Sequence, residues 1–222
     1  MKKLHLVLAI STALSLCAFG WAQVASRTGS TNSTASQKPP MKAASKEAAE
    51  RQFLQSLRLS PDQTRALDGM YRTAAEGYAS IPGLKTKEER VSRGVAVAEA
   101  RAATLKEVLN PTQYKAYDQW VESRVQAKHG GTDPVNAGAT NSAILGTLGL
   151  NRTQEKALAQ LQNRLLEANH TFYRLTETDS LGAAWYSHVV NSMSVEGTKS
   201  ILTAEQFKSW QQQWARSFGL SK

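Results

Sequence analysis

The sequence predicts an all-α protein, and three features of the 222-residue chain indicate this class. Apolar residues recur at spacings of three and four, which is the period of an amphipathic helix. A pattern typical of a helix start, Leu followed by Ser, Thr or Asn, two free positions and Gln, occurs four times. No segment shows the sustained alternation of apolar and polar residues that a half-buried strand requires. We expect about eight helices between residues 46 and 218.

The repeated pattern is a capping box. In such a box the cap side chain accepts a hydrogen bond from the N3 backbone N–H, and the N3 Gln reaches back to the backbone N–H of the cap. The predicted pairs are Ser60 and Gln63, Asn110 and Gln113, Asn151 and Gln154, and Thr203 and Gln206.

The first half of the folded part is expected to hold four helices. They cover about 46–57, 61–79, 86–108 and 111–129, and the glycines at 130 and 131 end the last of them. The third begins at a further capping box, with Thr86 as its cap. Its predicted inward stripe is Val91, Val95, Ala98, Ala102, Leu105 and Val108.

The second half repeats the pattern of the first. Leu54, Leu57, Gln63 and their neighbours match the stretch from Leu145 to Leu158, and the stretch around Gln113 matches that around Gln206. We interpret this as an internal duplication. In the middle of the second half, the predicted inward stripe is Leu181, Trp185, Val189 and Met193. Since each half has only about 80 residues and would have a marginal core alone, we expect the halves to pack together.

The amino-terminal residues have the layout of a secretory signal peptide. Lys2 and Lys3 precede an apolar run, and small residues surround an expected cleavage site after Ala22. An uncleaved anchor or a lipoprotein signal at Cys17 is the alternative. The expected organisation is therefore a signal peptide (1–22), a flexible basic tether (23–45), a first helical repeat (46–129), a linker (130–140) and a second repeat (141–222).

Composition limits the chemistry of the exported chain. Removal of the signal peptide removes the only cysteine, and with it any disulfide or thiolate ligand. Without Lys2 and Lys3, 25 basic residues face 18 acidic ones, a formal charge of +7. This balance suits anionic lipid or an acidic polypeptide. Nucleic acid is not expected as a partner of an exported protein, and no second segment predicts a membrane span.

Paired Leu-Thr-x-x-Gln motifs in a small exported helical protein resemble the Spy/CpxP family of periplasmic stress proteins. Only the stretch Leu202–Gln206 keeps the Thr of that motif, and the other copies have Ser or Asn. The family carries two motifs per chain and forms cradle-shaped dimers. The resemblance therefore implies two Spy-like helical hairpins, packed as a pseudo-dimer within one chain, and a monomer in solution.

The resemblance also implies a function: an ATP-independent periplasmic chaperone or envelope stress-response factor that binds unfolded or partly folded polypeptides through a basic, partly apolar surface. The candidate contact residues are Arg65, Arg72, Arg90, Arg93, Arg101, Arg164 and Arg174. For each of them an ordinary solvated helix face is the alternative. A dedicated regulatory or structural partner of one envelope protein is the second hypothesis, and metal handling is the third.

No catalytic constellation is evident in the sequence. There is no Gly-x-Ser-x-Gly elbow and no phosphate-binding loop, and the acidic pair Glu88 and Glu89 is explained by helix capping. The mature histidines, His129, His170 and His188, show no metal-ligand spacing. We therefore expect a protein that is not an enzyme and that uses no metal or cofactor.

Overall fold

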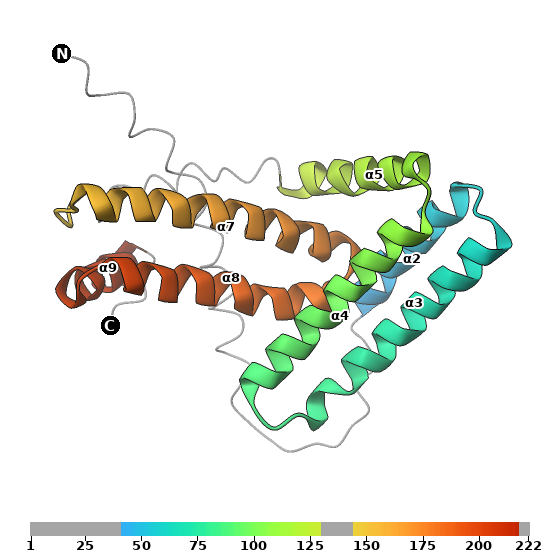
Figure 1. Ribbon diagram of the computed structural model, residues 1–222, viewed down its shortest axis with the longest axis horizontal. Helices are drawn as coiled ribbons and strands as arrows, with labels where there is room; N and C mark the ends of the chain where they lie inside the picture. Colours follow the sequence, from blue (N-terminus) through green and yellow to red (C-terminus); the bar gives the residue numbers. More distant parts are fainter. Residues whose placement is uncertain (1–40, 130–143, 218–222) are drawn as a thin grey trace, which may run out of the picture. The chain divides into compact units, whose positions relative to one another are not determined.

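The computed structural model describes residues 41–129 and 144–217 (Figure 1). These residues form helices and their connections, with no strand among them, so the predicted all-α class is confirmed. No helix in the described ranges combines the length and apolar character needed to cross a bilayer. The predicted signal peptide, the predicted linker and the tether up to residue 40 lie outside the described residues.

The helix boundaries follow the capping motifs closely. The elements are α2 (Met41–Ser56), α3 (Pro61–Ala79), the 3-10 helix η1 (Ile81–Gly83), α4 (Lys87–Val108), α5 (Pro111–His129), α7 (Arg152–Thr178), α8 (Ser180–Ile201) and α9 (Ala204–Ser217). A short helical turn at 144–146 precedes α7. The first helix begins at Met41 rather than near Lys46, inside the segment predicted to be a tether.

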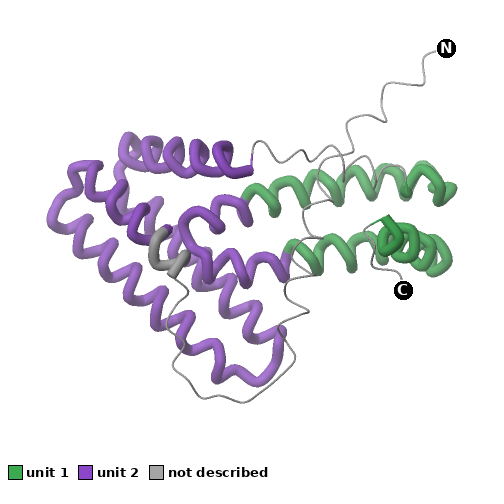
Figure 2. The backbone as a smooth tube through the Cα atoms, turned by 180° about the vertical axis from the view of Figure 1, so that it is seen from behind, with its two compact units in different colours: residues 1–31, 132–170, 190–222 green, residues 32–131, 171–189 purple. Residues whose placement is uncertain are grey.

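The chain forms two compact units (Figure 2). Of the described residues, unit 2 holds 41–129 and 171–189, and unit 1 holds 144–170 and 190–217. The boundary passes through α7 and α8, so the end of one and the start of the other pack with the first repeat. We call residues 171–189 the tip segment and residues 41–129 the body of unit 2. The sequence repeats and the compact units thus divide the chain at different places.

The body of unit 2 has a large apolar core. Helices α3 and α4 run antiparallel and are joined through η1 (Figure 1). Phe53 stacks on Trp120, with ring centroids 4.8 Å apart, at one side of this core. The buried cluster is Leu54, Leu67, Met70, Tyr71, Leu105, Leu109, Tyr117, Val121 and Val125. All of its members come from the body.

The buried face of α4 differs from the predicted stripe. Ala102 is exposed, whereas Gly94 and Arg101 are buried beside Val97, Ala98 and Leu105. Gly94 is buried because it allows close approach: a Cβ there would lie 2.1 Å from Cγ of Trp185. Arg101 is buried because it pairs with an acidic side chain, described below. A stripe chosen by apolar character alone misses both residues.

The buried face of α8 also differs from the prediction. Leu181 is 42% exposed, and the buried residues of this helix are Gly182, Ala183, Val190, Ser194 and Thr198. Small side chains form this face because the neighbouring helices come close. A Cβ on Gly182 would lie 2.8 Å from Cβ of Ala98, and one on Gly197 would lie 2.6 Å from Cδ1 of Leu161.

All four predicted capping boxes are present. Each Gln backbone N–H donates to the side chain of its cap residue, and each Gln Oε1 accepts from the backbone N–H of that cap, at distances between 2.9 and 3.2 Å. The prediction from the sequence is therefore confirmed for the pairs that begin at Ser60, Asn110, Asn151 and Thr203.

The glutamines also join the two helix starts of each repeat, which the sequence analysis did not predict. Gln63 Nε2 donates to Gln113 Oε1 at 2.7 Å, and Gln154 Nε2 donates to Gln206 Oε1 at the same distance. In addition, the Nε2 of each of these four glutamines donates to a backbone carbonyl that lies shortly before the cap residue of its partner glutamine. Those acceptors are Val108, Leu57, Ile201 and Leu148. We call each set of bonds an amide clasp.

The backbone conformation also matches at one pair of equivalent positions. Arg58 and Gly149 occupy equivalent positions of the two repeats, and both have a positive φ, 52° and 61°. A left-handed residue is therefore part of the repeat itself, with glycine at one copy and a strained arginine at the other. The two matching stretches thus share main-chain conformation at this position as well as the capping bonds.

Loss of a clasp glutamine is expected to cost more than loss of its cap. Thr203→Ala should lower the free energy of unfolding by about 1 kcal/mol. Gln206→Ala should lower it by about 2 kcal/mol, because the bonds to Gln154 and to the carbonyl of Leu148 are lost as well. Urea denaturation followed by circular dichroism measures both values. Equal losses for the two variants would show that the clasp adds nothing to the cap.

Candidate functional site

The predicted contact arginines have different environments. Arg65, Arg72, Arg93 and Arg164 are exposed, and Arg65 pairs with Asp62 on the same helix. Arg90 is half-buried and its Nε donates to the carbonyl of Leu84 at 2.9 Å. Arg164 belongs to unit 1, and the other six candidates belong to unit 2.

Arg101 corrects the surface prediction. Its side chain is only 6% exposed and forms an ion pair with Glu50, which is fully buried. The same guanidinium donates to the carbonyl of Thr178 at 3.0 Å. Arg101 is therefore not available to a polypeptide at the surface, and its role is to neutralise a buried carboxylate.

Two tyrosines complete the environment of Glu50. Tyr71 donates to Oε2 at 2.8 Å and Tyr117 donates to Oε1 at 2.6 Å, so both carboxylate oxygens are satisfied. Burial raises the pKa of Glu50 despite the opposing effects of Arg101 and the tyrosines. Burial, together with the charge of Glu50, also raises the pKa of both tyrosines. For Arg101, burial alone would lower the pKa, but Glu50 and Asp179 outweigh it and raise the pKa.

A second buried carboxylate, Glu177, lies among several cations. Its side chain is 1% exposed, and Lys128 donates to Oε2 at 2.7 Å. Arg124 lies 3.3 Å from Oε2, and Lys46 lies 3.5 Å from Oε1. His129 Nε2 is 3.9 Å from Oε1. We call Lys46, Arg124, Lys128 and His129 the basic cluster.

The charges of this cluster are unbalanced. Lys46, Arg124 and Lys128 carry three formal positive charges against the single carboxylate of Glu177, and each remains between 27% and 46% exposed. Burial would raise the pKa of Glu177, but the bond from Lys128 and the surrounding cations outweigh it and lower the pKa. Burial and the positive charges of Lys46 and Lys128 lower the pKa of His129.

The stabilisation from Glu177 is expected to be lost in acid. Because the folded-state pKa lies below the ordinary value of 4.5, the contribution is present above that pH and disappears as the pH falls through the folded-state pKa. Glu177→Gln should therefore reduce the slope of stability against pH below pH 4.5. Urea midpoints between neutral pH and pH 3 measure this slope. If the stability of the Glu177→Gln variant falls as steeply in acid as that of wild type, the lowered pKa of Glu177 is not the cause of the slope.

The other anchors of the tip segment are Asp179 and Arg174. Asp179 Oδ2 accepts a hydrogen bond from Tyr78 at 2.5 Å, and its Oδ1 accepts one from the backbone of Gly182 at 2.9 Å. Arg174 pairs with Asp118 and Glu122 of α5. Arg174 was predicted as a surface contact, and the structure instead places it in an ion pair within unit 2.

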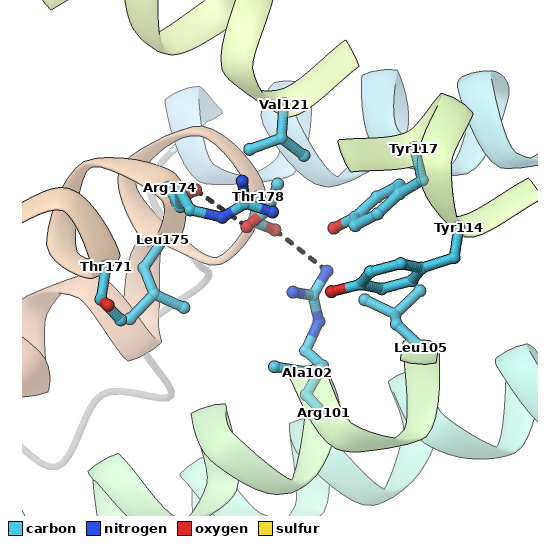
Figure 3. A pocket seen from close by; sticks show the side chains of 10 residues that line it. All are labelled: Arg101, Ala102, Leu105, Tyr114, Tyr117, Val121, Thr171, Arg174, Leu175 and Thr178. Carbon is cyan, nitrogen blue, oxygen red and sulfur yellow. Dashed lines mark hydrogen bonds between the residues drawn. The ribbon is translucent and has the colours of Figure 1, made fainter. Parts of the chain in front are cut away.

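A cavity of about 150 Å³ lies between the tip segment and the body. Figure 3 shows Arg101, Tyr114 and Tyr117 on the body side and Arg174, Thr171 and Leu175 on the tip side. The two arginines that border it are both paired with carboxylates. Its lining therefore carries no strong net charge for a small ion.

No group of three or more His, Cys, Asp or Glu side chains within 41–129 and 144–217 has an arrangement that could hold a metal ion. His188 is half-buried, and burial followed by the charge of Lys87 lowers its pKa. His170 is exposed and belongs to the other unit.

Comparison of the chain with protein-family models, with curated proteins and with solved structures gives no significant match.

The residues at the centre of this site are not predictable from the local sequence pattern. Glu50, Glu177 and Asp179 were not singled out, since an acidic residue on a helix usually faces solvent. One sequence signal was available: Thr176-Glu177-Thr178-Asp179 places two acids at the break between two helices in an otherwise acid-poor stretch.

Proposed function

We propose that the protein is an exported, non-enzymatic helical binding protein that acts without ATP as a chaperone or envelope stress-response factor on unfolded or partly folded polypeptides. The observation that carries the proposal is the amide clasp, present in both repeats with the same hydrogen bonds. It supports the resemblance to the Spy/CpxP family, because the shared motif closes the base of a helical hairpin in each repeat.

On this proposal one chain corresponds to two protomers of the family. The matching clasps and the matching positive φ values at Arg58 and Gly149 support this interpretation. Exposed arginines supply long-range attraction to polypeptides, and half-buried aromatic residues such as Phe207 and Trp214 supply adaptable contacts. Arg65 and Arg72 lie two turns apart on the exposed face of α3 and are available for such contacts.

A client-aggregation assay tests the proposal. The purified chain, mixed in equimolar amount with a denatured client and no ATP, should reduce light scattering at low salt. The reduction should weaken at about 1 M salt, where the screening length is about 3 Å. Arg72→Ser with Arg93→Ser should weaken it as well. The matched control is Lys106→Ser with Lys115→Ser, because these residues are also exposed and basic on α4 and α5.

Two results would count against the proposal. Client aggregation that is unchanged at both salt concentrations would exclude general chaperone activity. Unchanged client aggregation, together with a pull-down in which the purified chain captures one dominant protein from an envelope extract, would favour the dedicated-partner hypothesis. Equal losses for the arginine and lysine variants would instead show that charge acts without regard to position.

A further inference from the structure

The tip segment packs against the body of unit 2, and the two parts have separate buried apolar clusters. The buried members of the body's apolar cluster all come from residues 41–129, and the partly buried Tyr173 of the tip segment packs against them. The tip segment forms a separate and much smaller cluster, in which Leu175 and Ala183 meet Ala98. The body therefore has a core of its own, and the tip segment lies against its surface.

The contacts between tip segment and body combine charged and polar pairs with apolar packing by Tyr173, Leu175 and Trp185. Glu177 meets the basic cluster, Arg174 meets two acids of α5, and the carbonyl of Thr178 accepts from Arg101. Asp179 accepts from Tyr78. Interfaces between partners that associate reversibly are more polar than the cores of obligate ones. The polar share of this contact is typical of a reversible interface.

Shape complementarity is high at one point and poor at another. Trp185 of the tip segment lies against Gly94, where any Cβ would overlap the indole ring. The cavity of about 150 Å³ remains between the same two parts, beside Arg101 and Leu175 (Figure 3). The body thus has a glycine that makes room for one aromatic side chain, and beside it a cavity that the tip segment leaves unfilled. A surface with both features can also hold segments similar to the tip segment.

We propose that the face of the body that holds the tip segment is a binding site for acidic helical polypeptide segments, and that the tip segment is its intrachain competitor. The proposal rests on the proposed polypeptide-binding function and names the class of polypeptide bound. The acidic preference applies to the part of the face at the basic cluster, where three formal positive charges of Lys46, Arg124 and Lys128 face one carboxylate. Asp118 and Glu122, on the same face, instead select a basic residue at the place of Arg174. Arg124 adds a buried Nε–H that has no acceptor among the described residues.

A tethered competitor should mask the site strongly. A segment connected to its own binding surface has an effective concentration in the millimolar range. A free peptide at micromolar concentration therefore competes poorly with it. Weakening the tip segment, while the body stays unchanged, should open the site to a peptide supplied in solution.

The test uses the full chain with a weakened tip segment. Arg174→Glu places a third negative charge beside Asp118 and Glu122, and Glu177→Gln removes the charge that the basic cluster holds. The probe is a fluorescein-labelled peptide with the sequence of residues 171–189, measured by fluorescence anisotropy. We expect the double variant to bind this peptide at least about tenfold more tightly than wild type, because the tethered competitor is weakened.

Two controls define the specificity. Arg152→Glu makes the same charge change at an exposed arginine of α7 outside the tip segment and should leave peptide binding at the wild-type level. A peptide carrying Gln for Glu177 and Asn for Asp179 should bind the double variant at least about tenfold more weakly, since charge-assisted bonds are the stronger ones.

Hydrogen exchange shows whether the body survives the change. Exchange should accelerate in residues 171–189 of the double variant and stay slow in the body core, in α3 and α5. Loss of protection in both regions together would show that the tip segment is an integral part of the fold, and would overturn the proposal. Unchanged protection of the tip segment, in the double variant and in Trp185→Glu alike, would also overturn it.

The two proposals fail separately. A wild-type chain that suppresses client aggregation, with a double variant that does not bind the peptide, removes this inference and leaves the proposed function standing. Peptide binding to the double variant, with no effect of either protein on client aggregation, supports the masked site and removes the general chaperone function.

Discussion

Replacing Arg101 by Met is expected to lower the free energy of unfolding by about 3–5 kcal/mol, because a buried carboxylate is left without its charged partner. Glu50 is fully buried, so water cannot replace the guanidinium. The carbonyl of Thr178 loses its donor in the same variant. Denaturation by guanidinium chloride, followed by circular dichroism, measures the change in the free energy of unfolding. A loss below about 1 kcal/mol, the range of exposed ion pairs, would contradict the buried pair.

A double variant separates the charge from the packing. Combining Arg101→Met with Glu50→Gln removes both charges and keeps an amide whose oxygen accepts from one of Tyr71 and Tyr117 while its NH2 donates to the hydroxyl of the other. Replacement of both partners of a buried pair is often nearly neutral, so the double variant should lose less than about half of what the single variant loses. A double variant as unstable as the single one would show that the side-chain volume of Arg101, rather than its charge, matters at this position.

Truncation of Leu165 to Ala is expected to cost about 2–5 kcal/mol, the range for a large aliphatic side chain in a core. Leu165 is 0% exposed and lies in the part of α7 that belongs to unit 1, among the buried residues Leu158, Leu161 and Ala168. The expected loss comes from the apolar area that returns to water and from the cavity that remains. Chemical denaturation of the full chain measures it.

The neighbouring leucine is the matched control. Leu166 is 44% exposed, so Leu166→Ala removes the same atoms on the same helix with little change in burial. We expect a change within about 0.5 kcal/mol, as for most surface substitutions. Similar losses for the two variants would show that Leu166 is covered in solution, by a second copy or by a bound partner.

The local features of the fold were predictable from the sequence because they depend on neighbouring residues. The capping boxes at Ser60 and Thr203 need only a cap and a Gln three positions later, and the structure has all four. Boundaries marked by proline were predicted equally well, since Pro61 and Pro111 begin their helices. Periodicity gave the all-α class for the same reason.

The features that join distant residues were not predictable. Glu50 and Arg101 are 51 positions apart, and nothing in either helix indicates that the other will neutralise it. An arginine on a helix is ordinarily a surface residue, so Arg101 was assigned to the surface. Likewise the repeat pattern assigns residues 171–189 to the second repeat, while their contacts place them in unit 2. Pairing partners and unit boundaries are properties of the tertiary structure.

The amide clasp restricts which residues can replace each other within the motif. The cap position needs only one short acceptor, and the four copies use Ser, Asn, Asn and Thr there. The Gln position must accept from a backbone N–H and donate to a main-chain carbonyl, and in each clasp one glutamine also donates to the side chain of the other. Only a glutamine has both groups at that reach. Glutamate could cap its helix, but it would place a carboxylate against the facing amide oxygen and against main-chain carbonyls. A pattern used to find related chains should therefore vary the cap freely and keep both glutamines fixed, about 50 residues apart.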